Sequence, residues 1–145
     1  MRWLLIAILL CSCAKPEKYI ETANKYVGLH EVENNIELYN FLEYDPVQYA
    51  WCAAFVNAAL REHGLPQAEK QLLARSFLNW GRPVNKPIYG DLIIFDVGDE
   101  DWQGHVGFFI EEKDGKYIIL GGNQSNKVSY KPYSITKVIG IRRLL

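Results

Sequence analysis

The spacing of apolar residues divides the chain into two parts. In the first part apolar residues recur every three or four positions, which is the periodicity of amphipathic helices. It predicts helices over residues 16–27 and 35–44, from Cys52 to the stop signal at Gly64, and over 69–80. After Pro87, short apolar runs bounded by Gly, Asp and Asn predict strands at 91–95, 104–111, 116–120, 127–130 and 138–142. Helices followed by strands indicate an α+β fold, with the N-terminal helices packed on one face of an antiparallel sheet of about five strands.

The first residues have the pattern of an export signal. Arg2 precedes an apolar run over residues 4–10, which is too short to span a bilayer. The segment Leu10–Cys13 resembles a bacterial lipobox, which assigns residues 1–12 to a signal peptide and lipidation to Cys13. A plain secretory signal or an uncleaved anchor is the alternative. We therefore expect an exported protein of the cell envelope, lipid-anchored in a membrane and facing the periplasm or cell wall, with one domain over residues 16–145.

Charge and histidine spacing exclude several classes of partner. The formal net charge is −1 and no basic stripe is present, so nucleic acid is excluded as a partner. The three histidines, His30, His63 and His105, lack the paired spacing of metal ligands. We expect a monomer that needs no metal and no other cofactor.

Cys52 is the candidate nucleophile. It stands at the predicted start of an Ala-rich helix, where unpaired N–H groups and the helix dipole lower the pKa of a thiol. Cleavage before Cys13 would leave Cys52 as the one free thiol of an exported protein, which marks it as reactive. The alternative is a small, buried core residue, because free cysteines are often found in that role.

His105 is the candidate general base. On its strand it shares a side with Gly107, and the glycines around it are expected to leave open space beside the imidazole. The next strand ends at Gly121–Ser125, and antiparallel pairing brings that end opposite the start of the histidine strand. Asn123 is therefore expected to orient the imidazole, with Gln124 as the rival. A hydrogen-bonded structural histidine and a plain turn at 123–126 are the alternatives.

Four segments, in this order and at these spacings, resemble the CHAP amidohydrolase/peptidase family, and more closely a bacterial and phage subgroup of it. They are Trp51–Val56, Gly90–Phe95, Gly104–Phe108 and Gly121–Ser125. The pair Asn34-Asn35 and the segment Ala74–Trp80 resemble the subgroup as well, so that the resemblance extends from Tyr19 to Arg143.

This resemblance implies a papain-like fold and hydrolysis of amide bonds in peptidoglycan. The cysteine of the family falls on Cys52 and its histidine on His105. Many relatives have a glutamate two residues before an asparagine on the third strand. Here Gly121 occupies the place of the acid, and Asn123 remains as the candidate third residue.

The sequence thus predicts a cysteine peptidoglycan hydrolase that works through an acyl-enzyme. His105 takes the thiol proton, Cys52 attacks a carbonyl carbon, and the N–H of Cys52 stabilises the oxyanion. Gln48 and Tyr49 are both open as the second oxyanion donor. The residues expected to bind substrate are Trp51, Trp102, Gln124 and Tyr49.

Three questions stay open at this point. The cleaved bond lies within the stem peptide (an endopeptidase) or between muramic acid and alanine (an N-acetylmuramoyl-L-alanine amidase). A catalytically weak or inactive cell-wall-binding lipoprotein of the same fold is the alternative to an enzyme. A phage or toxin lysis protein would use the same chemistry on a host or a competitor.

Overall fold

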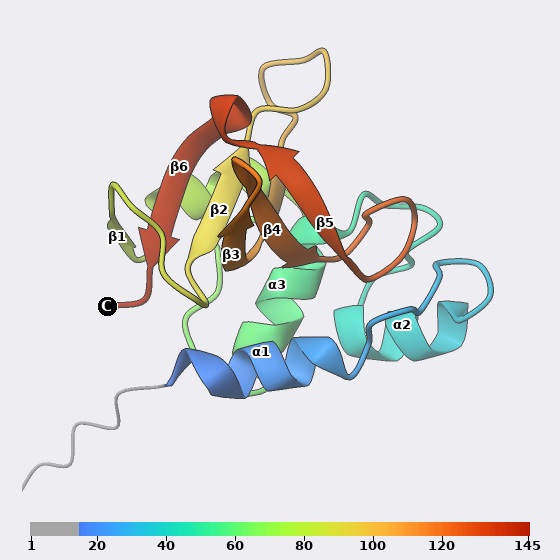
Figure 1. Cartoon of the computed structure of the whole chain (residues 1–145). Helices are drawn as coiled ribbons and strands as arrows, with labels where there is room; N and C mark the ends of the chain where they lie inside the picture. The colour runs from blue at the N-terminus through green and yellow to red at the C-terminus, as the bar shows by residue number, and fades with distance from the viewer. Residues whose placement is uncertain (1–14) are drawn as a thin grey trace, which may run out of the picture.

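The computed structural model describes residues 15–145 and shows helices packed against a six-stranded antiparallel sheet (Figure 1). The helices are α1 (Pro16–Asn24), α2 (Asn35–Leu42) and α3 (Cys52–Arg61), with 3-10 helices η1 (Ala74–Asn79) and η2 (Ile135–Lys137). The strands are β1 (Arg82–Pro83), β2 (Leu92–Phe95), β3 (His105–Lys113), β4 (Lys116–Gly121), β5 (Ser129–Ser134) and β6 (Val138–Arg143). Their order in the sheet is β1-β6-β2-β3-β4-β5. The expected α+β class is confirmed, with one strand more than predicted.

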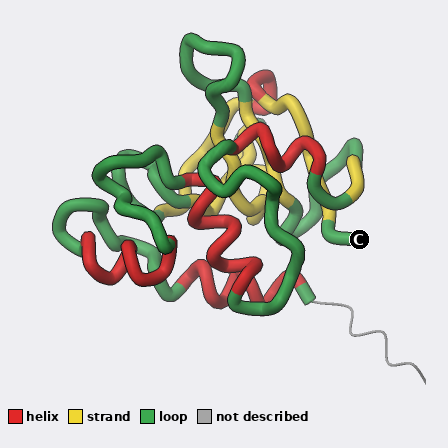
Figure 2. Tube along the Cα trace, turned by 180° about the vertical axis from the view of Figure 1, so that it is seen from behind, coloured by secondary structure: helices red, strands yellow, loops and turns green. Residues whose placement is uncertain are grey.

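Helix α3 lies at the centre of the molecule. Each of its residues from Cys52 to Leu60 is buried, because α3 contacts the sheet at β3 as well as α1 and α2. Four alanines leave room for this close approach on several sides, and a helix that is apolar all round is typical of a core position. Seen from behind, the helices stand in front of the strands (Figure 2). The first residue of α3 is therefore held by packing along the whole helix.

The sheet is buried on both faces, and the two faces have different partners. Val106 and Phe108 of β3 belong to the apolar cluster beneath the helices. On the other face, Phe95, Phe109 and Ile119 form a second cluster among the strands themselves, joined by Tyr133 of the edge strand β5. Because side chains alternate along β3, His105 lies on the side of this second cluster.

The segment 69–80, predicted as one helix, contains only η1. The side chain of Asn57 in α3 binds two backbone groups where this helix was expected to begin, and the carbonyl of Gln71 is one that a helix would use. Its Oδ1 accepts from the N–H of Ala68 at 2.9 Å, and its Nδ2 donates to the carbonyl of Gln71 at 3.3 Å. Asn57 is fully buried, so its amide holds the preceding loop against the core.

Two strand predictions also differ from the structure. β5 starts at Ser129 and continues through Pro132, beyond the predicted end at residue 130. Proline is tolerated there because β5 is an edge strand, where a missing N–H costs no bond to a neighbouring strand. The short β1 was not predicted, since two residues give no periodicity, and it is defined only by pairing with β6.

The glycines beside His105 allow close packing and do not leave open space. A Cβ on Gly107 would lie 2.3 Å from Cγ2 of Ile119 and 3.0 Å from the carbonyl oxygen of Leu120. A Cβ on Gly104 would lie 3.0 Å from the carbonyl oxygen of Phe95. The expectation of free space around the imidazole was therefore wrong, because strand β4 and the end of β2 approach too closely for a side chain.

Candidate active site

Cys52 begins α3 and is 7 % exposed. Burial raises the pKa of its thiol, and the nearby backbone N–H groups of Val106, Ala53 and Cys52 lower it by a smaller amount. The expectation of a lowered pKa at the helix start is thus corrected, since desolvation of the thiolate outweighs the N–H groups. In the resting protein the group is a neutral thiol.

The effect of the Val106 N–H on the thiol pKa also places the sulfur relative to β3. Val106 follows His105 directly in β3, so the Cys52 sulfur lies beside the backbone at the start of the histidine strand. Tyr133 lies near Cys52 as well: burial raises the pKa of its hydroxyl, and a negative charge on Cys52 would raise it further. The thiol therefore lies close to the start of β3 and to Tyr133, the ring on which His105 is stacked.

His105 is 6 % exposed and lies against aromatic rings. Its ring is stacked on Tyr133, with centroids 5.0 Å apart and 17° between the planes, and Tyr133 is stacked in turn on Phe95 at 4.7 Å. Burial lowers the pKa of His105 to about 4, the hydrogen bond with Gln124 raises it, and the charge of Lys131 lowers it. The imidazole is therefore neutral at neutral pH and can accept a proton.

Gln124 is the side chain that meets the imidazole, with Oε1 3.0 Å from Nε2 of His105. The orientation of its amide is fixed, because its Nε2 donates to the carbonyl oxygens of Ser129 at 2.6 Å and Ile119 at 3.3 Å, which can only accept. Its Oε1 must then accept from the imidazole, so Nε2 of His105 carries the hydrogen. The lone pair that acts as a base is consequently on Nδ1.

Asn123, the expected orienting residue, lies in the turn beside Gln124. Its φ is +54°, and its side chain is only half-buried, whereas Gln124 is 1 % exposed. The left-handed turn at Asn123 directs the following residue inward. Of the two residues considered from the sequence, the structure brings Gln124 and not Asn123 to the imidazole.

Gly121 explains how Gln124 can occupy this place. A Cβ on Gly121 would lie 2.6 Å from Oε1 of Gln124 and 3.4 Å from Nε2 of His105. A side chain at position 121 and the carboxamide of Gln124 therefore compete for the same space beside the imidazole. Gly121 stands where the resemblance to the CHAP family places an acid. Because this position has no side chain, Gln124 can reach the imidazole.

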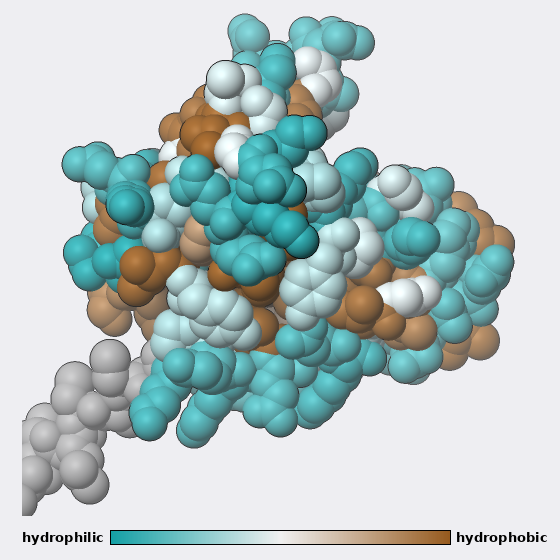
Figure 3. Space-filling view, in the orientation of Figure 1, coloured by the Kyte–Doolittle hydropathy of each residue, from teal (hydrophilic) through white to brown (hydrophobic). Residues whose placement is uncertain are grey.

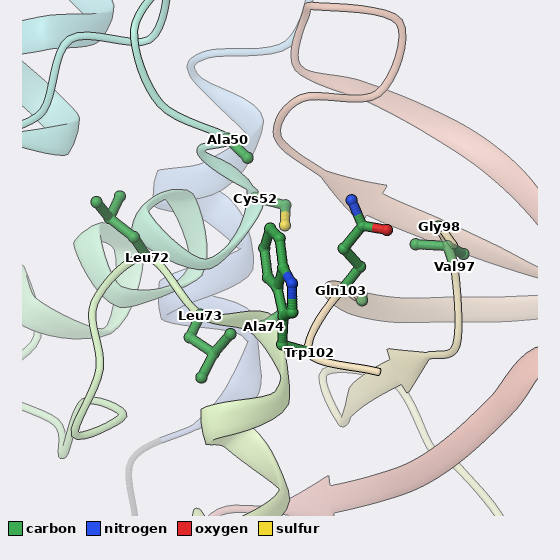
Figure 4. A pocket seen from close by; sticks show the side chains of 10 residues that line it. Ala50, Cys52, Leu72, Leu73, Ala74, Val97, Gly98, Trp102 and Gln103 are labelled. Atoms are coloured by element: carbon green, nitrogen blue, oxygen red, sulfur yellow. The ribbon is translucent and has the colours of Figure 1, made fainter. Parts of the chain in front are cut away.

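A cavity of about 200 Å³ opens at the cysteine (Figure 4). Its lining is largely apolar and comes from three segments: Ala50 and Cys52, Leu72, Leu73 and Ala74, and Val97, Gly98, Trp102, Gln103 and Gly104. The indole of Trp102 lies next to the Cys52 sulfur, and Gln103 projects beside it. Trp102 is 63 % exposed, so it forms a wall of the cavity that solvent and substrate can reach.

Arg75 fixes the loop that carries Trp102. Its NH2 group forms an ion pair with Asp96 at 2.6 Å, and its Nε donates to the carbonyl of Gln103 at 2.6 Å. Oε1 of Gln103 accepts from the N–H groups of Asp99 and Glu100 at 2.6 and 2.9 Å. With Oε1 so engaged, the amide NH2 of Gln103 is the part of this side chain left for a ligand.

Trp51 does not lie where a residue of the substrate groove is expected, whereas the position of Tyr49 does not contradict that role. Trp51 is fully buried, its indole N–H donates to Glu31 at 3.0 Å, and its ring would be 2.7 Å from a Cβ on Gly122. Its place in a substrate groove is therefore corrected: Trp51 supports the turn that carries Gln124. Tyr49 is 47 % exposed on the loop before α3, with its ring against Tyr44.

Sequence reasoning missed Gln103, Arg75 and Tyr133. Arg75 lies in the quoted segment Ala74–Trp80, but its bonds to Asp96 and Gln103 are distant in sequence. Gln103 bonds to the nearby Asp99 and Glu100, and no periodicity indicates this contact or the stacking of Tyr133 on His105. Cys13 and the proposed signal peptide lie outside the described residues. Within residues 15–145 there is no group of three or more His, Cys, Asp or Glu placed to hold a metal ion. No helix in this same range has the length and apolar character required to cross a bilayer.

Comparisons with known proteins identify the family and the fold. A family model described as CHAP domain matches residues 44–123. The chain is similar in structure to a protein from Staphylococcus aureus subsp. aureus Mu50 described as similar to lipoprotein, NLP/P60 family. The TM-score is 0.61 at 18 % identity, over 90 % of this chain and 41 % of that one. It is also similar to the wild type endolysin LysIME-EF1, with a TM-score of 0.61 at 16 % identity, over 90 % and 64 % of the two chains. No curated protein matches.

The two solved structures show the fold alone, because both identities are low. The chain spans less than two thirds of the length of either of them.

The lowered pKa of His105 predicts a loss of stability in acid. Between its ordinary value of 6.5 and about 4, the unfolded chain binds a proton that the folded protein does not, so stability falls as pH decreases through this window. The expected loss is about 3 kcal/mol for one group. It is measured as the free energy of unfolding in urea at pH 7 and pH 4, for the wild type and His105→Gln. The variant keeps His30 and His63, so an equal pH dependence in both proteins would contradict the assignment.

Proposed function

The chain belongs to the CHAP domain family, and on that premise we propose that it hydrolyses amide bonds of peptidoglycan, with Cys52 as nucleophile and His105 as general base. Cell-wall hydrolysis is the activity that membership of this family implies. The observation that carries the assignment of roles is the hydrogen-bond chain from Ser129 and Ile119 through Gln124 to His105. It leaves Nδ1 as the basic nitrogen of a neutral imidazole, and the proposal requires this nitrogen to face the thiol.

The proposed reaction starts from a neutral pair. Because burial raises the pKa of Cys52 and lowers that of His105, a preformed thiolate–imidazolium pair is disfavoured. Nδ1 of His105 takes the thiol proton as the sulfur attacks the carbonyl carbon and forms the S–C bond. The proton then passes to the nitrogen of the leaving amine as the C–N bond breaks. Water, deprotonated by the same nitrogen, releases the acyl group from the sulfur.

Two donors are available for the oxyanion of the tetrahedral intermediate. The N–H of Cys52 lies at the start of α3, where helix N–H groups lack partners within the helix. The amide NH2 of Gln103 faces the same cavity, and its orientation is fixed because Oε1 is held by two backbone N–H groups. We assign Gln103 the second role, in preference to Gln48 or Tyr49.

The size and lining of the cavity limit the substrate. About 200 Å³ is less than a drug-sized pocket and accommodates one small residue, and the walls from Leu72, Leu73 and Trp102 favour an apolar group. Alanine at the cleaved bond fits this description. Cleavage within the stem peptide and cleavage between muramic acid and alanine both remain compatible with it.

A second candidate is a wall-binding protein of the same fold without catalysis. The raised pKa of the Cys52 thiol favours it, since a neutral thiol is a weaker nucleophile than a thiolate. The absence of an acid at Gly121 favours it as well. A phage or toxin lysis protein would use the same site chemistry as an enzyme of wall maintenance, so the site geometry favours neither of these two roles.

We further propose an exported protein of the cell envelope, lipid-anchored at Cys13. The leader pattern over residues 1–12 supports this location, as does the similarity in structure to a Staphylococcus aureus protein described as similar to lipoprotein.

Digestion of purified peptidoglycan is the experiment that tests the activity. The full chain should release soluble fragments, and Cys52→Ala should release none while keeping the wild-type unfolding curve. Mass spectrometry of the fragments identifies the new amine terminus and distinguishes an endopeptidase from an amidase. Fragments from Cys52→Ala would refute the mechanism, and binding of peptidoglycan without fragments from wild type would favour the wall-binding protein.

Variants of the two neighbouring amides test which one orients the imidazole. Gln124→Ala should lower kcat by about 10- to 100-fold with a small change in KM, because the imidazole loses its fixed tautomer. Asn123→Ala is the matched control and should stay close to wild type. Gln124→Glu should retain activity and move the acid limb of the pH–rate profile upward, since a carboxylate stabilises the imidazolium. A larger loss in Asn123→Ala than in Gln124→Ala would reverse the assignment.

The lipid anchor predicts a mass and a location. Full-length protein extracted from membranes should be heavier than the chain starting at Cys13 by the mass of its acyl chains. Cys13→Ala should abolish this increase and change the fractionation of the protein. An unmodified mass for the wild type, with unchanged fractionation of the variant, would exclude lipidation.

A further inference from the structure

Exposed cations gather where the described chain begins. Lys15 and Lys18 lie at the start of α1, Arg82 lies in β1 and Lys86 in the loop that follows; all four are exposed. Contacts tie these segments together, since a Cβ on Gly90 would lie 2.4 Å from Cβ of Pro16. Pro16, Arg82 and Ile88 also line one hollow of about 310 Å³. The four cations therefore belong to one surface.

Few acids neutralise this surface. Glu17 is exposed between the two lysines of α1, and Glu21 is exposed three residues after Lys18. These two carboxylates stand against the four cations. Asp91 is buried, and Arg143 binds its carboxylate through Nε at 2.8 Å and NH2 at 2.7 Å. The Asp91–Arg143 ion pair has no net charge, so Asp91 does not neutralise the exposed cations around it.

Apolar side chains are exposed among these cations. Ile88 is 54 % exposed and Tyr89 is 42 % exposed, both in the loop between β1 and β2. Brown, hydrophobic surface is visible beside the point where the grey trace meets the described chain (Figure 3). We call the six side chains Lys15, Lys18, Arg82, Lys86, Ile88 and Tyr89 the basal face. Cations interspersed with exposed aliphatic and tyrosine side chains are typical of surfaces that lie on anionic bilayers.

The proposed anchor attaches next to this face. Cys13 precedes Pro16 by three residues, which span at most about 10 Å when extended. A bilayer holding Cys13, or holding the apolar run 4–10 if it is retained, is thus brought within reach of the basal face.

The catalytic end of the molecule lies on the opposite side. Phe95, at the end of β2, pairs with His105, whereas Gly90 and Asp91 precede the start of β2 at the basal face. Helix α3 also runs from the catalytic end toward α1. Cys52 is its first residue, and His63, just after its last residue, contacts Thr22 of α1 at 2.8 Å. Ten helical residues separate the two ends of α3 by about 15 Å.

From these observations we infer that the basal face rests on an anionic lipid bilayer and holds the cavity at Cys52 facing away from the membrane. The inference rests on the proposed envelope location and is independent of whether the site hydrolyses peptidoglycan. The cations contact lipid phosphates, Ile88 and Tyr89 enter the interface, and the cleft faces the cell wall.

Photocrosslinking from the bilayer tests this orientation. The full chain is reconstituted in vesicles of phosphatidylcholine with about one third phosphatidylglycerol, which contain a lipid with a diazirine near its headgroup. Lipid adducts on residues 82–90 should exceed those on the catalytic-end loop 96–104 by at least about fivefold. Equal labelling of the two segments, or an excess on 96–104, would overturn the proposal, as would labelling confined to the segment before residue 15.

Charge reversal separates binding by the basal face from mere proximity to the anchor. Lys18→Glu with Lys86→Glu should lower the adducts on residues 82–90 by at least about fivefold. The matched control, Lys70→Glu with Lys127→Glu, makes the same change on loops near the catalytic end and should leave the adducts unaltered. Equal effects of the two pairs, or no effect of the first, would contradict the electrostatic contact. These vesicles contain no peptidoglycan, so a failed digest and a failed orientation are distinct results.

Discussion

The burial of α3 on all sides is the constraint on which the rest of the structure depends. A helix in contact with the sheet, α1 and α2 has no freedom to shift, so its first residue is fixed in position. The same burial removes water from the sulfur and raises the pKa of the Cys52 thiol. The fold thus holds the thiol in a fixed position and disfavours its ionisation. In the proposed reaction its proton is removed by His105, which burial keeps neutral.

Gln124 resolves the ambiguity that a neutral imidazole brings. A neutral ring has two tautomers, and only the one with its lone pair on Nδ1 suits the proposed base. A carboxylate at this place would select the same tautomer and also stabilise the imidazolium, whereas a carboxamide selects it without adding charge. The amide can do so because Ser129 and Ile119 bind its NH2 group and thereby direct its oxygen to the ring. Trp51 beneath Gly122 completes the support of this turn.

The features of the fold that depend on local sequence pattern were predicted correctly. Those that depend on contacts between distant residues were not. The α+β class, the helix that begins at Cys52 and the strand that begins near His105 follow from periodicity and turn residues. The choice between Asn123 and Gln124 does not, because the positive φ of Asn123 breaks the alternation of side chains at the end of β4. The burial of Trp51 depends on Gly122 and Glu31, and the loop in place of a helix at 69–73 depends on Asn57. Gly122, Glu31 and Asn57 are all distant in sequence from the residues that they contact, and the φ of Asn123 is not readable from a periodic pattern.

The segment matched by the family model ends at Asn123, one residue before the side chain that orients the histidine. Gln124, its anchor Ser129 and the stacked Tyr133 all lie beyond that boundary. A gene fusion or a truncation made at the boundary would pass on the thiol and the imidazole but lose the means of selecting the tautomer. The hydrogen bond to His105 therefore requires the edge hairpin of β4 and β5 together with the core. Drift in this hairpin can alter the chemistry of the site while the motifs used to recognise the family stay unchanged.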